Sequence, residues 1–180
     1  MNIAYVTSLK RGETDRLLTE TANQLQAQGK SLTGIVKVAN YKSSFDNGCD
    51  MQVRVLPKGP DIKITQNLGK GSDACRLDPA AIAEAVTRVD SGSMGRSDLF
   101  ILNKFGPEEA AGRGFCTVIG TALDQGVPVL VGVGGASIKA FEGFAGGLAV
   151  PVAATEQAIL DWVHSALSDS RVTATDNMRY

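Results

Sequence analysis

The stretch 99–109 constrains the fold more than any other part of the sequence. Its first four residues are apolar, a length typical of a strand buried in a parallel sheet. Polar residues, a glycine and a proline follow at once, between Asn103 and Pro107. In α/β proteins the ligand lies at the edge of the sheet where the parallel strands end. The sequence therefore predicts an α/β fold with a functional site just after residue 102.

Strands and helices alternate on both sides of this stretch. Further short apolar runs predict strands at 3–6, 32–38, 127–133 and 146–152. The segment 51–66 alternates apolar and polar residues around a turn, which predicts a β-hairpin inserted after the second strand. We therefore expect one three-layer domain with a mostly parallel sheet over residues 1–167, and a flexible polar tail at 168–180.

Capping residues mark where the helices between these strands begin. Asp78 followed by Pro79 is typical of a helix start, and Thr155 is expected to cap the last helix. Two glycines shortly after the central strand lower helix propensity, so the next helix is expected to begin near Phe115. Each helix carries apolar residues at helical spacing and is expected to cover a face of the sheet.

The composition is that of a soluble globular protein. The chain has 180 residues, 43% of them hydrophobic, and a formal net charge of -1. Because it has no global basic field, we expect no nucleic-acid partner, and an anion site must be local. The sequence shows no secretory leader and no run of about eighteen apolar residues, so we expect a cytoplasmic protein without membrane insertion. The sequence does not decide whether the protein forms a homo-oligomer.

The three cysteines, Cys49, Cys75 and Cys116, show neither close pairing nor metal-ligand spacing. An odd number without close pairs predicts neither a disulfide framework nor a four-thiolate zinc site. We expect them to be small buried or loop residues, and the sequence names no metal. The sequence leaves open whether these cysteines of several subunits together build a metal or oxyanion centre.

The segment 7–14 joins the first strand to a helix through a glycine-containing loop. N–H groups at a helix start and the helix dipole favour an anion in such a turn. The segment is not a standard phosphate loop, because Glu13 stands where that motif has its lysine and would repel a triphosphate. An ordinary strand-to-helix turn is the alternative. The candidate anion-binding residues of this loop are Ser8, Lys10, Gly12 and Thr14.

A second glycine-rich segment, 69–77, contains two cations. Backbone N–H groups in such a segment can surround an anion. A flexible connection between two elements is the alternative. The candidate residues of this second loop are Gly69, Gly71, Ser72, Cys75 and Arg76.

The order of elements and the stretch 98–109 resemble the small phosphate-loop nucleoside triphosphatases of the cancer-related family. The chain resembles more closely an uncharacterised bacterial family built on the same plan, domain-of-unknown-function family 2478. The motifs that carry this resemblance are Asn103-Lys104-Phe105-Gly106, Glu109-Ala110, Gly112-Arg113-Gly114-Phe115, Cys75-Arg76-Leu77-Asp78 and Phe144-Ala145-Gly146-Gly147. The resemblance implies a three-layer domain similar to the P-loop nucleoside triphosphatases.

Members of that bacterial family are often described beside molybdenum-transport or nitrogenase genes. This context implies a molybdenum-type oxyanion, molybdate or tungstate, as the ligand. The residues themselves do not distinguish molybdate from phosphate or sulfate.

Two departures from the triphosphatase pattern concern charge. Glu13 replaces the lysine of the loop, and Asn103-Lys104 replaces the acidic residues that serve magnesium. Losing both removes the main electrostatic contributions to phosphoryl transfer. One hypothesis is that the charges have exchanged sides, so that Lys104 faces Glu13 and adds positive charge to the cleft. The alternative is a purely structural ion pair at a decayed site.

The residues that follow the central strand have structural and functional interpretations. Carboxylates in a first helical turn usually complement the helix dipole, and we favour this role for Glu108 and Glu109. The alternative is that Glu109 orients a water or the lysine. Arg113 is a candidate to reach the cleft, although a solvated guanidinium is the more frequent case. Lys104 and Arg113 complete the anion-binding set, and the supporting residues are Glu13, Asn103, Gly106 and Glu109.

These observations predict non-hydrolytic binding of a small oxyanion, such as molybdate or tungstate, or of a nucleotide phosphate. The role would be storage, delivery or sensing. One alternative is a divergent nucleoside triphosphatase in which Lys104 or Lys10 compensates for the lost lysine. Another is an interaction protein with a decayed site. The sequence points to no cofactor other than such an oxyanion or nucleotide.

Overall fold

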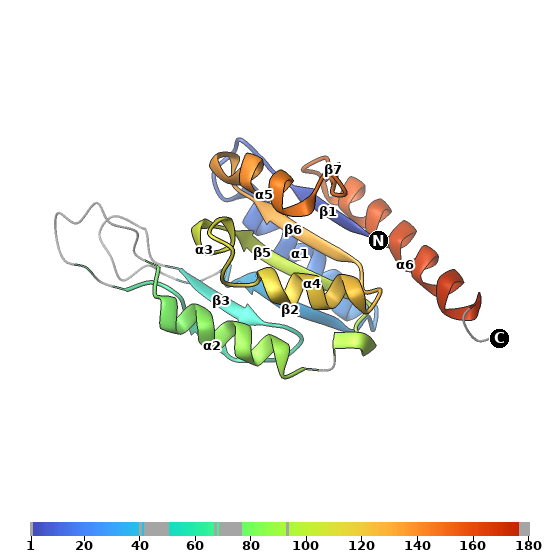
Figure 1. The fold of residues 1–180 in the computed structure, drawn as a ribbon, viewed down its shortest axis with the longest axis horizontal. Helices are drawn as coiled ribbons and strands as arrows, with labels where there is room; N and C mark the ends of the chain where they lie inside the picture. Colours follow the sequence, from blue (N-terminus) through green and yellow to red (C-terminus); the bar gives the residue numbers. More distant parts are fainter. Residues whose placement is uncertain are drawn as a thin grey trace.

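The computed structural model of the chain describes residues 2–39, 41, 51–66, 68, 77–92 and 94–176, with side chains as far as residue 169. Within these residues the strands form one seven-stranded sheet in the order β4-β3-β2-β5-β6-β1-β7 (Figure 1). The strands are β1 (Ile3–Val6), β2 (Leu32–Lys37), β3 (Gln52–Val55), β4 (Asp61–Lys63), β5 (Leu99–Phe105), β6 (Val129–Val133) and β7 (Val150–Val152). All pairs are parallel except β2 with β3 and β3 with β4. The mostly parallel sheet with an inserted hairpin is confirmed.

Helices cover both faces of this sheet. They are α1 (Glu13–Ala27), α2 (Pro79–Asp90), α3 (Pro107–Ala110), α4 (Cys116–Asp124), α5 (Ile138–Ala145) and α6 (Glu156–Asp176), with short 3-10 turns η1 (Met94–Arg96) and η2 (Gly135–Ser137). Helices α1 and α6 bury Leu18 and Ile159 against one face. Helices α2, α4 and α5 cover the other face, where Ile119 and Phe141 are buried. The three-layer α/β fold expected from the sequence is confirmed (Figure 1).

Local sequence signals set the helix starts. Asp78 accepts hydrogen bonds from two N–H groups in the first turn of α2, at 2.9 and 3.3 Å. Thr155 accepts one from the N–H of Ala158 at 3.3 Å, just before α6. Helix α4 begins at Cys116, close to the position expected from the preceding glycines. These three starts follow from residues within a few positions of each helix.

Helix α6 extends into the segment 168–180, for which the sequence predicts a flexible tail. The helix continues to Asp176, beyond the last residue assigned to the domain from sequence. The tail was expected because the sequence becomes polar, but a helix already anchored on the core through Ile159 and Val163 extends at little cost per residue. Neither α6 nor any other helix of the described residues has the length and apolar character needed to cross a membrane.

The carboxyl ends of β1, β6 and β5 lie next to one another. Val6 pairs with Gly132, and Phe105 pairs with Val133. The loop after β1 and the segment after β5 therefore leave the sheet at the same edge, which is where the sequence places its site.

Candidate functional site

The loop between β1 and α1 folds back on one of its own carboxylates. Gly12 has a φ of 76°, a conformation that L side chains rarely adopt. The Ser8 hydroxyl donates to Oε2 of Glu13 at 2.5 Å, and Nζ of Lys10 lies 3.7 Å from Oε1. The N–H of Lys10 donates to Ser8 Oγ at 3.1 Å. Two predicted anion-binding side chains thus converge on one carboxylate.

The electrostatics of this loop keep Glu13 ionised. The hydrogen bond from Ser8 has the largest effect and lowers the pKa of Glu13. Desolvation comes next and opposes it, and the charges of Lys10 and Arg16 lower the pKa further. The first N–H groups of α1 add the positive end of the helix dipole. The loop therefore stabilises one negative charge at the start of α1.

Glu13 is paired within its own loop and not with Lys104. Its ion pair is with Lys10. Lys104 is an exposed residue at the end of β5, and β6 separates β5 from β1. The hypothesis of charges exchanged between Glu13 and Lys104 is therefore corrected, because donors on the same loop lie closer to the carboxylate. The loop and the lysine are two separate features of the sheet edge.

Asn103 and Thr14 do come together, at the first turn of α1. Asn103 is 2% exposed, and its Nδ2 donates to the carbonyl of Asp15 at 3.4 Å. A Cβ added to Gly132 of β6 would lie 3.1 Å from Thr14 Cγ2 and 3.4 Å from Asn103 Oδ1. The close approach therefore depends on the glycine. Asn103 Oδ1 has no hydrogen-bond partner among the described residues, which is uncommon for a buried acceptor.

Glu109 has a structural position below the sheet edge. The residue is 7% exposed, and its carboxylate accepts hydrogen bonds from the N–H groups of Gly106 at 2.9 Å and Phe115 at 3.1 Å. These bonds join the start of α3 to the start of α4. A Cβ on Gly114 would lie 2.1 Å from Glu109 Oε1, so the chain passes very close to the carboxylate. Both carboxylate oxygens thus bind backbone, and neither is directed at a lysine.

Arg113 binds Glu108 instead of reaching the β1–α1 loop. Its Nε and Nη2 donate to the two oxygens of Glu108 at 2.9 and 3.1 Å, while its side chain stays 63% exposed. The hydrogen bond from Arg113 lowers the pKa of Glu108. The same contact raises the pKa of Arg113. A bidentate pair thus occupies the guanidinium fork, and the anion-binding role of Arg113 stays a prediction.

The second candidate loop lies outside the described residues. This covers Gly69, Gly71, Ser72, Cys75 and Arg76, as well as Cys49. Cys116 is described: its thiol donates to the carbonyl of Glu109 at 3.3 Å, and burial, followed by the charge of Glu109, raises its pKa. The described residues contain no group of three or more side chains arranged to hold a metal ion.

A polar hollow of about 360 Å³ begins at Gly12 and follows α1. Its cations are already neutralised, because Lys37 lies 3.0 Å from a carboxylate oxygen of Asp15 and Arg16 pairs with Glu20. Its described lining residues therefore offer no free positive charge to an anion.

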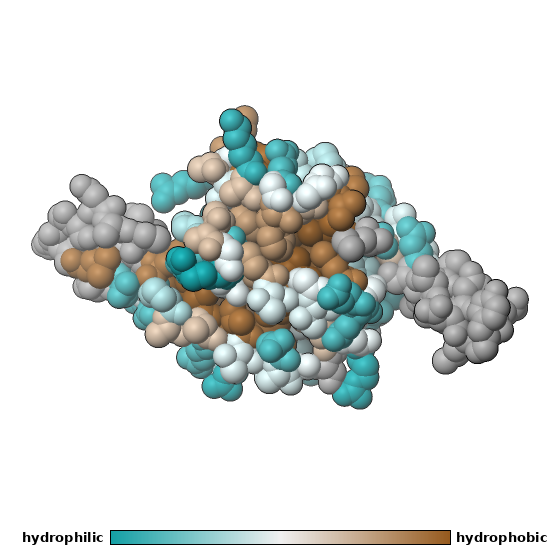
Figure 2. All heavy atoms as spheres, in the orientation of Figure 1, coloured by the Kyte–Doolittle hydropathy of each residue, from teal (hydrophilic) through white to brown (hydrophobic). Residues whose placement is uncertain are grey.

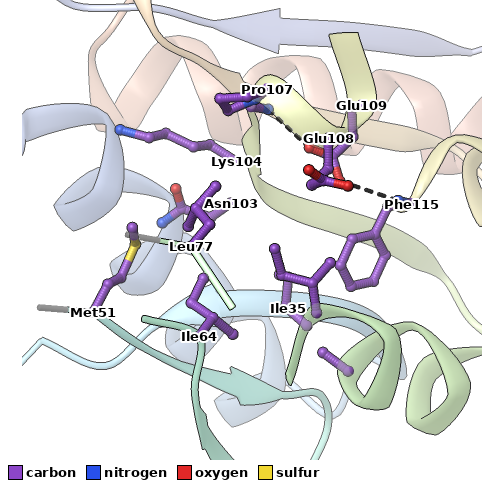
Figure 3. A pocket seen from close by; sticks show the side chains of 13 residues that line it. Ile35, Met51, Ile64, Leu77, Asn103, Lys104, Pro107, Glu108, Glu109 and Phe115 are labelled. Atoms are coloured by element: carbon purple, nitrogen blue, oxygen red, sulfur yellow. Dashed lines mark hydrogen bonds between the residues drawn. The ribbon is translucent and has the colours of Figure 1, made fainter. Parts of the chain in front are cut away.

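An apolar cavity of about 80 Å³ lies at the same sheet edge, beside Lys104 (Figure 3). Several of its polar lining residues, among them Asn103 and Lys104, were singled out from the sequence. Its apolar walls were not, because they are far apart along the chain and have the pattern of ordinary core. The apolar lining includes Ile35, Ile64, Leu77, Ile82, Ala85 and Phe115.

The arrangement of the sheet and its helices is similar to that of a solved structure. The structure is similar to the solution structure of a human cancer-related nucleoside triphosphatase, with a TM-score of 0.59 over 100% of both chains and 15% sequence identity. At that identity the likeness concerns the fold alone. The protein therefore has an α/β fold similar to that of this triphosphatase.

The chain belongs to the family described as "Protein of unknown function (DUF2478)", whose profile matches residues 3–162. It is also 35% identical, over 160 residues and 89% of its length, to the molybdenum import ATP-binding protein ModC 2 of Bradyrhizobium diazoefficiens. The aligned part is only 18% of that relative's length. The family resemblance inferred from the sequence motifs is confirmed.

Proposed function

We propose that the protein binds a small oxyanion, or the phosphate of a nucleotide, at the β1–α1 loop without hydrolysing it. The observation that carries the proposal is the ionised Glu13 carboxylate, which the hydroxyl of Ser8 and the ammonium of Lys10 hold at the start of α1. Groups that stabilise this internal anion can stabilise an external one in its place. The external anion enters when the Glu13 side chain, which is 22% exposed, rotates away.

Two features favour binding over hydrolysis. The loop has Glu13 in place of the lysine that clamps a triphosphate, and β5 carries Asn103 and Lys104 near its carboxyl end in place of magnesium-binding acids. Phosphoryl transfer draws most of its rate from those groups. The fold likeness to a triphosphatase favours the alternative of a divergent enzyme, in which Lys10 takes over the role of the clamp. Magnesium-dependent release of phosphate from a nucleotide distinguishes the two.

The similarity to a molybdenum import ATP-binding protein supports molybdate or tungstate as the oxyanion. The part shared with this relative is a small fraction of a much longer chain, so the import activity itself is not carried over. We place the protein beside such import, in the storage, delivery or sensing of the oxyanion in the cytoplasm. The second loop is a further candidate contact for the same ligand.

A thermal-shift panel tests this function. The ligands are molybdate, tungstate, sulfate, phosphate, ATP and GTP, each with and without magnesium. A ligand that binds only the folded chain adds about 2.7 kcal/mol at about 100 times its Kd, which raises Tm by about 5 to 11 °C. We expect an oxyanion or a nucleotide to do so without turnover. The effect should be lost in Ser8→Ala and kept in Lys139→Gln, an exposed lysine on α5. No shift with any of these anions would contradict the proposal.

Replacing Glu13 with glutamine should strengthen oxyanion binding. The change removes a carboxylate that competes for Ser8 and Lys10 and repels the ligand. We expect Kd to fall about fivefold at low ionic strength, the upper range for one exposed charge pair, and less at high salt. Calorimetric titration measures this. Glu84→Gln, which alters an exposed ion pair on α2, is the control and should leave Kd unchanged. A weaker complex in Glu13→Gln would mean that Glu13 supports the ligand.

A further inference from the structure

The cavity beside Lys104 has the properties of a site for an apolar group. Its walls are aliphatic and aromatic side chains from β2, α2 and the start of α4, together with Ile64 and Leu77. Figure 2 shows apolar surface between α3 and α2, the two helices that contribute to this cavity. Protein interiors are close-packed, and water in an apolar cavity finds few hydrogen-bond partners. An apolar ligand body gains contacts there that water does not supply.

The charges around the cavity favour an anion. The carboxylate of Glu108 is held by Arg113, and that of Glu109 accepts two backbone N–H groups. Lys104 forms no ion pair with any residue of the described segments. In Figure 3 its side chain extends away from the two glutamates and from Phe115. Among the described lining residues it is therefore the charge left for a ligand.

We infer that this cavity binds a small organic anion, with its apolar body among Ile35, Ile64 and Phe115 and its carboxylate against Lys104. A volume of about 80 Å³ is that of about three waters in the liquid, so a branched group of about three or four carbon atoms fills it. A bare oxyanion has no such body. The inference goes beyond the proposed function, because it assigns Lys104 to a second ligand and not to the β1–α1 loop.

The two sites are separate in the fold. The loop follows β1, whereas the cavity lies on the side of β5 that faces β2 and the hairpin, and β6 stands between β1 and β5. Ligand binding at one site can therefore be removed by substitution without touching the other.

Titration of the full chain with isovalerate, isovaleramide and acetate, followed by NMR, tests the inference. Isovalerate has the branched body and the charge, isovaleramide lacks the charge, and acetate lacks the body. We expect isovalerate to bind at least about tenfold more tightly than acetate, because acetate lacks three of its buried carbons. Lys104→Gln should weaken the binding of isovalerate about fivefold and leave the binding of isovaleramide unchanged. Lys139→Gln is the matched control and should change neither.

Filling the cavity gives the second arm of the test. Ala85→Leu places a larger side chain inside it and should abolish binding of isovalerate and isovaleramide while the Tm shows a folded chain. Ile82→Phe fills the cavity from the preceding turn of α2, and it replaces Ala85→Leu in the test if that variant does not fold. Equal affinity for isovalerate and acetate, or unchanged binding in the filled variant, overturns the inference. If Lys104→Gln weakens the binding of isovalerate and of isovaleramide equally, the proposed role of the Lys104 charge is overturned.

The loop variants separate this inference from the proposed function. Ser8→Ala should leave isovalerate binding intact, and Lys104→Gln should leave molybdate or phosphate binding at the loop intact. Loss of oxyanion binding in Lys104→Gln would mean that Lys104 contributes to the site at the β1–α1 loop, and it would overturn the assignment of Lys104 to the cavity.

Discussion

Replacing Gly34 with alanine should prevent the chain from reaching its native fold. Gly34 lies in β2 opposite Ile101 of β5, with a φ of 109°. A Cβ there would stand 2.0 Å from the carbonyl oxygen of Ile101 and 2.8 Å from its carbonyl carbon. Both are backbone atoms in the middle of the sheet, so neither can move aside without breaking the pairing of β2 with β5. We expect a loss of more than about 4 kcal/mol, beyond the usual range for one substitution.

Circular dichroism and urea unfolding measure this effect. The matched control is Gly120→Ala in α4, where an added Cβ meets nothing within 4 Å. Alanine has the higher helix propensity, so this variant should be more stable by about 0.5 to 1 kcal/mol. A native-like urea transition in Gly34→Ala would mean that β2 and β5 separate more easily than the structure indicates. Since β2 carries Ile35 and β5 carries Lys104, the cavity would then also be adjustable.

Replacing Glu109 with alanine should lower the free energy of unfolding by about 3 kcal/mol. The N–H groups of Gly106 and Phe115 would lose their acceptor beneath α3 and α4. A buried donor left unsatisfied costs about 1 to 3 kcal/mol. For a chain of this length the loss corresponds to a fall in Tm of about 6 to 12 °C, which differential scanning calorimetry resolves.

Glu108→Ala is the matched control for this prediction. Glu108 is the neighbouring residue, and it pairs with an exposed guanidinium on the surface. Exposed ion pairs contribute little to stability, so its Tm should change by no more than about 2 °C. The Tm of Glu109→Gln should lie between those of Glu108→Ala and Glu109→Ala. The amide oxygen of the glutamine still accepts from one N–H, whereas its NH₂ group cannot accept from the other. Equal losses in Glu108→Ala and Glu109→Ala would contradict the capping role of Glu109.

Much of the fold could be predicted from short-range patterns. The cap at Asp78 and the cap at Thr155 depend on hydrogen bonds to residues two or three positions away. The buried strands follow from apolar runs, and the hairpin follows from alternation around a turn. The extent of α6 was less predictable, because the core residues that anchor the helix stabilise a polar turn beyond them.

The elements that carry the predicted site residues could be predicted from the sequence, but the contacts of these residues could not. Asn103 was expected at the carboxyl edge and does meet the first turn of α1. Glu13 was expected to face Lys104, yet its partners are Ser8 and Lys10. Arg113 was a candidate anion ligand, and the structure directs it to Glu108. Long charged side chains have many reachable partners, and the sequence does not show which of them is nearest.

The sequence by itself determined the order of strands and helices, the loop before α1 and the sheet edge at which the predicted site residues lie. These depend on periodicity and capping, which act over a few residues. Only the tertiary structure decided that Glu109 joins α3 to α4 and that Ile35, Ile64 and Phe115 enclose a cavity beside Lys104. Such contacts join residues from different strands and helices, so they exist only once the sheet has set the distances between them.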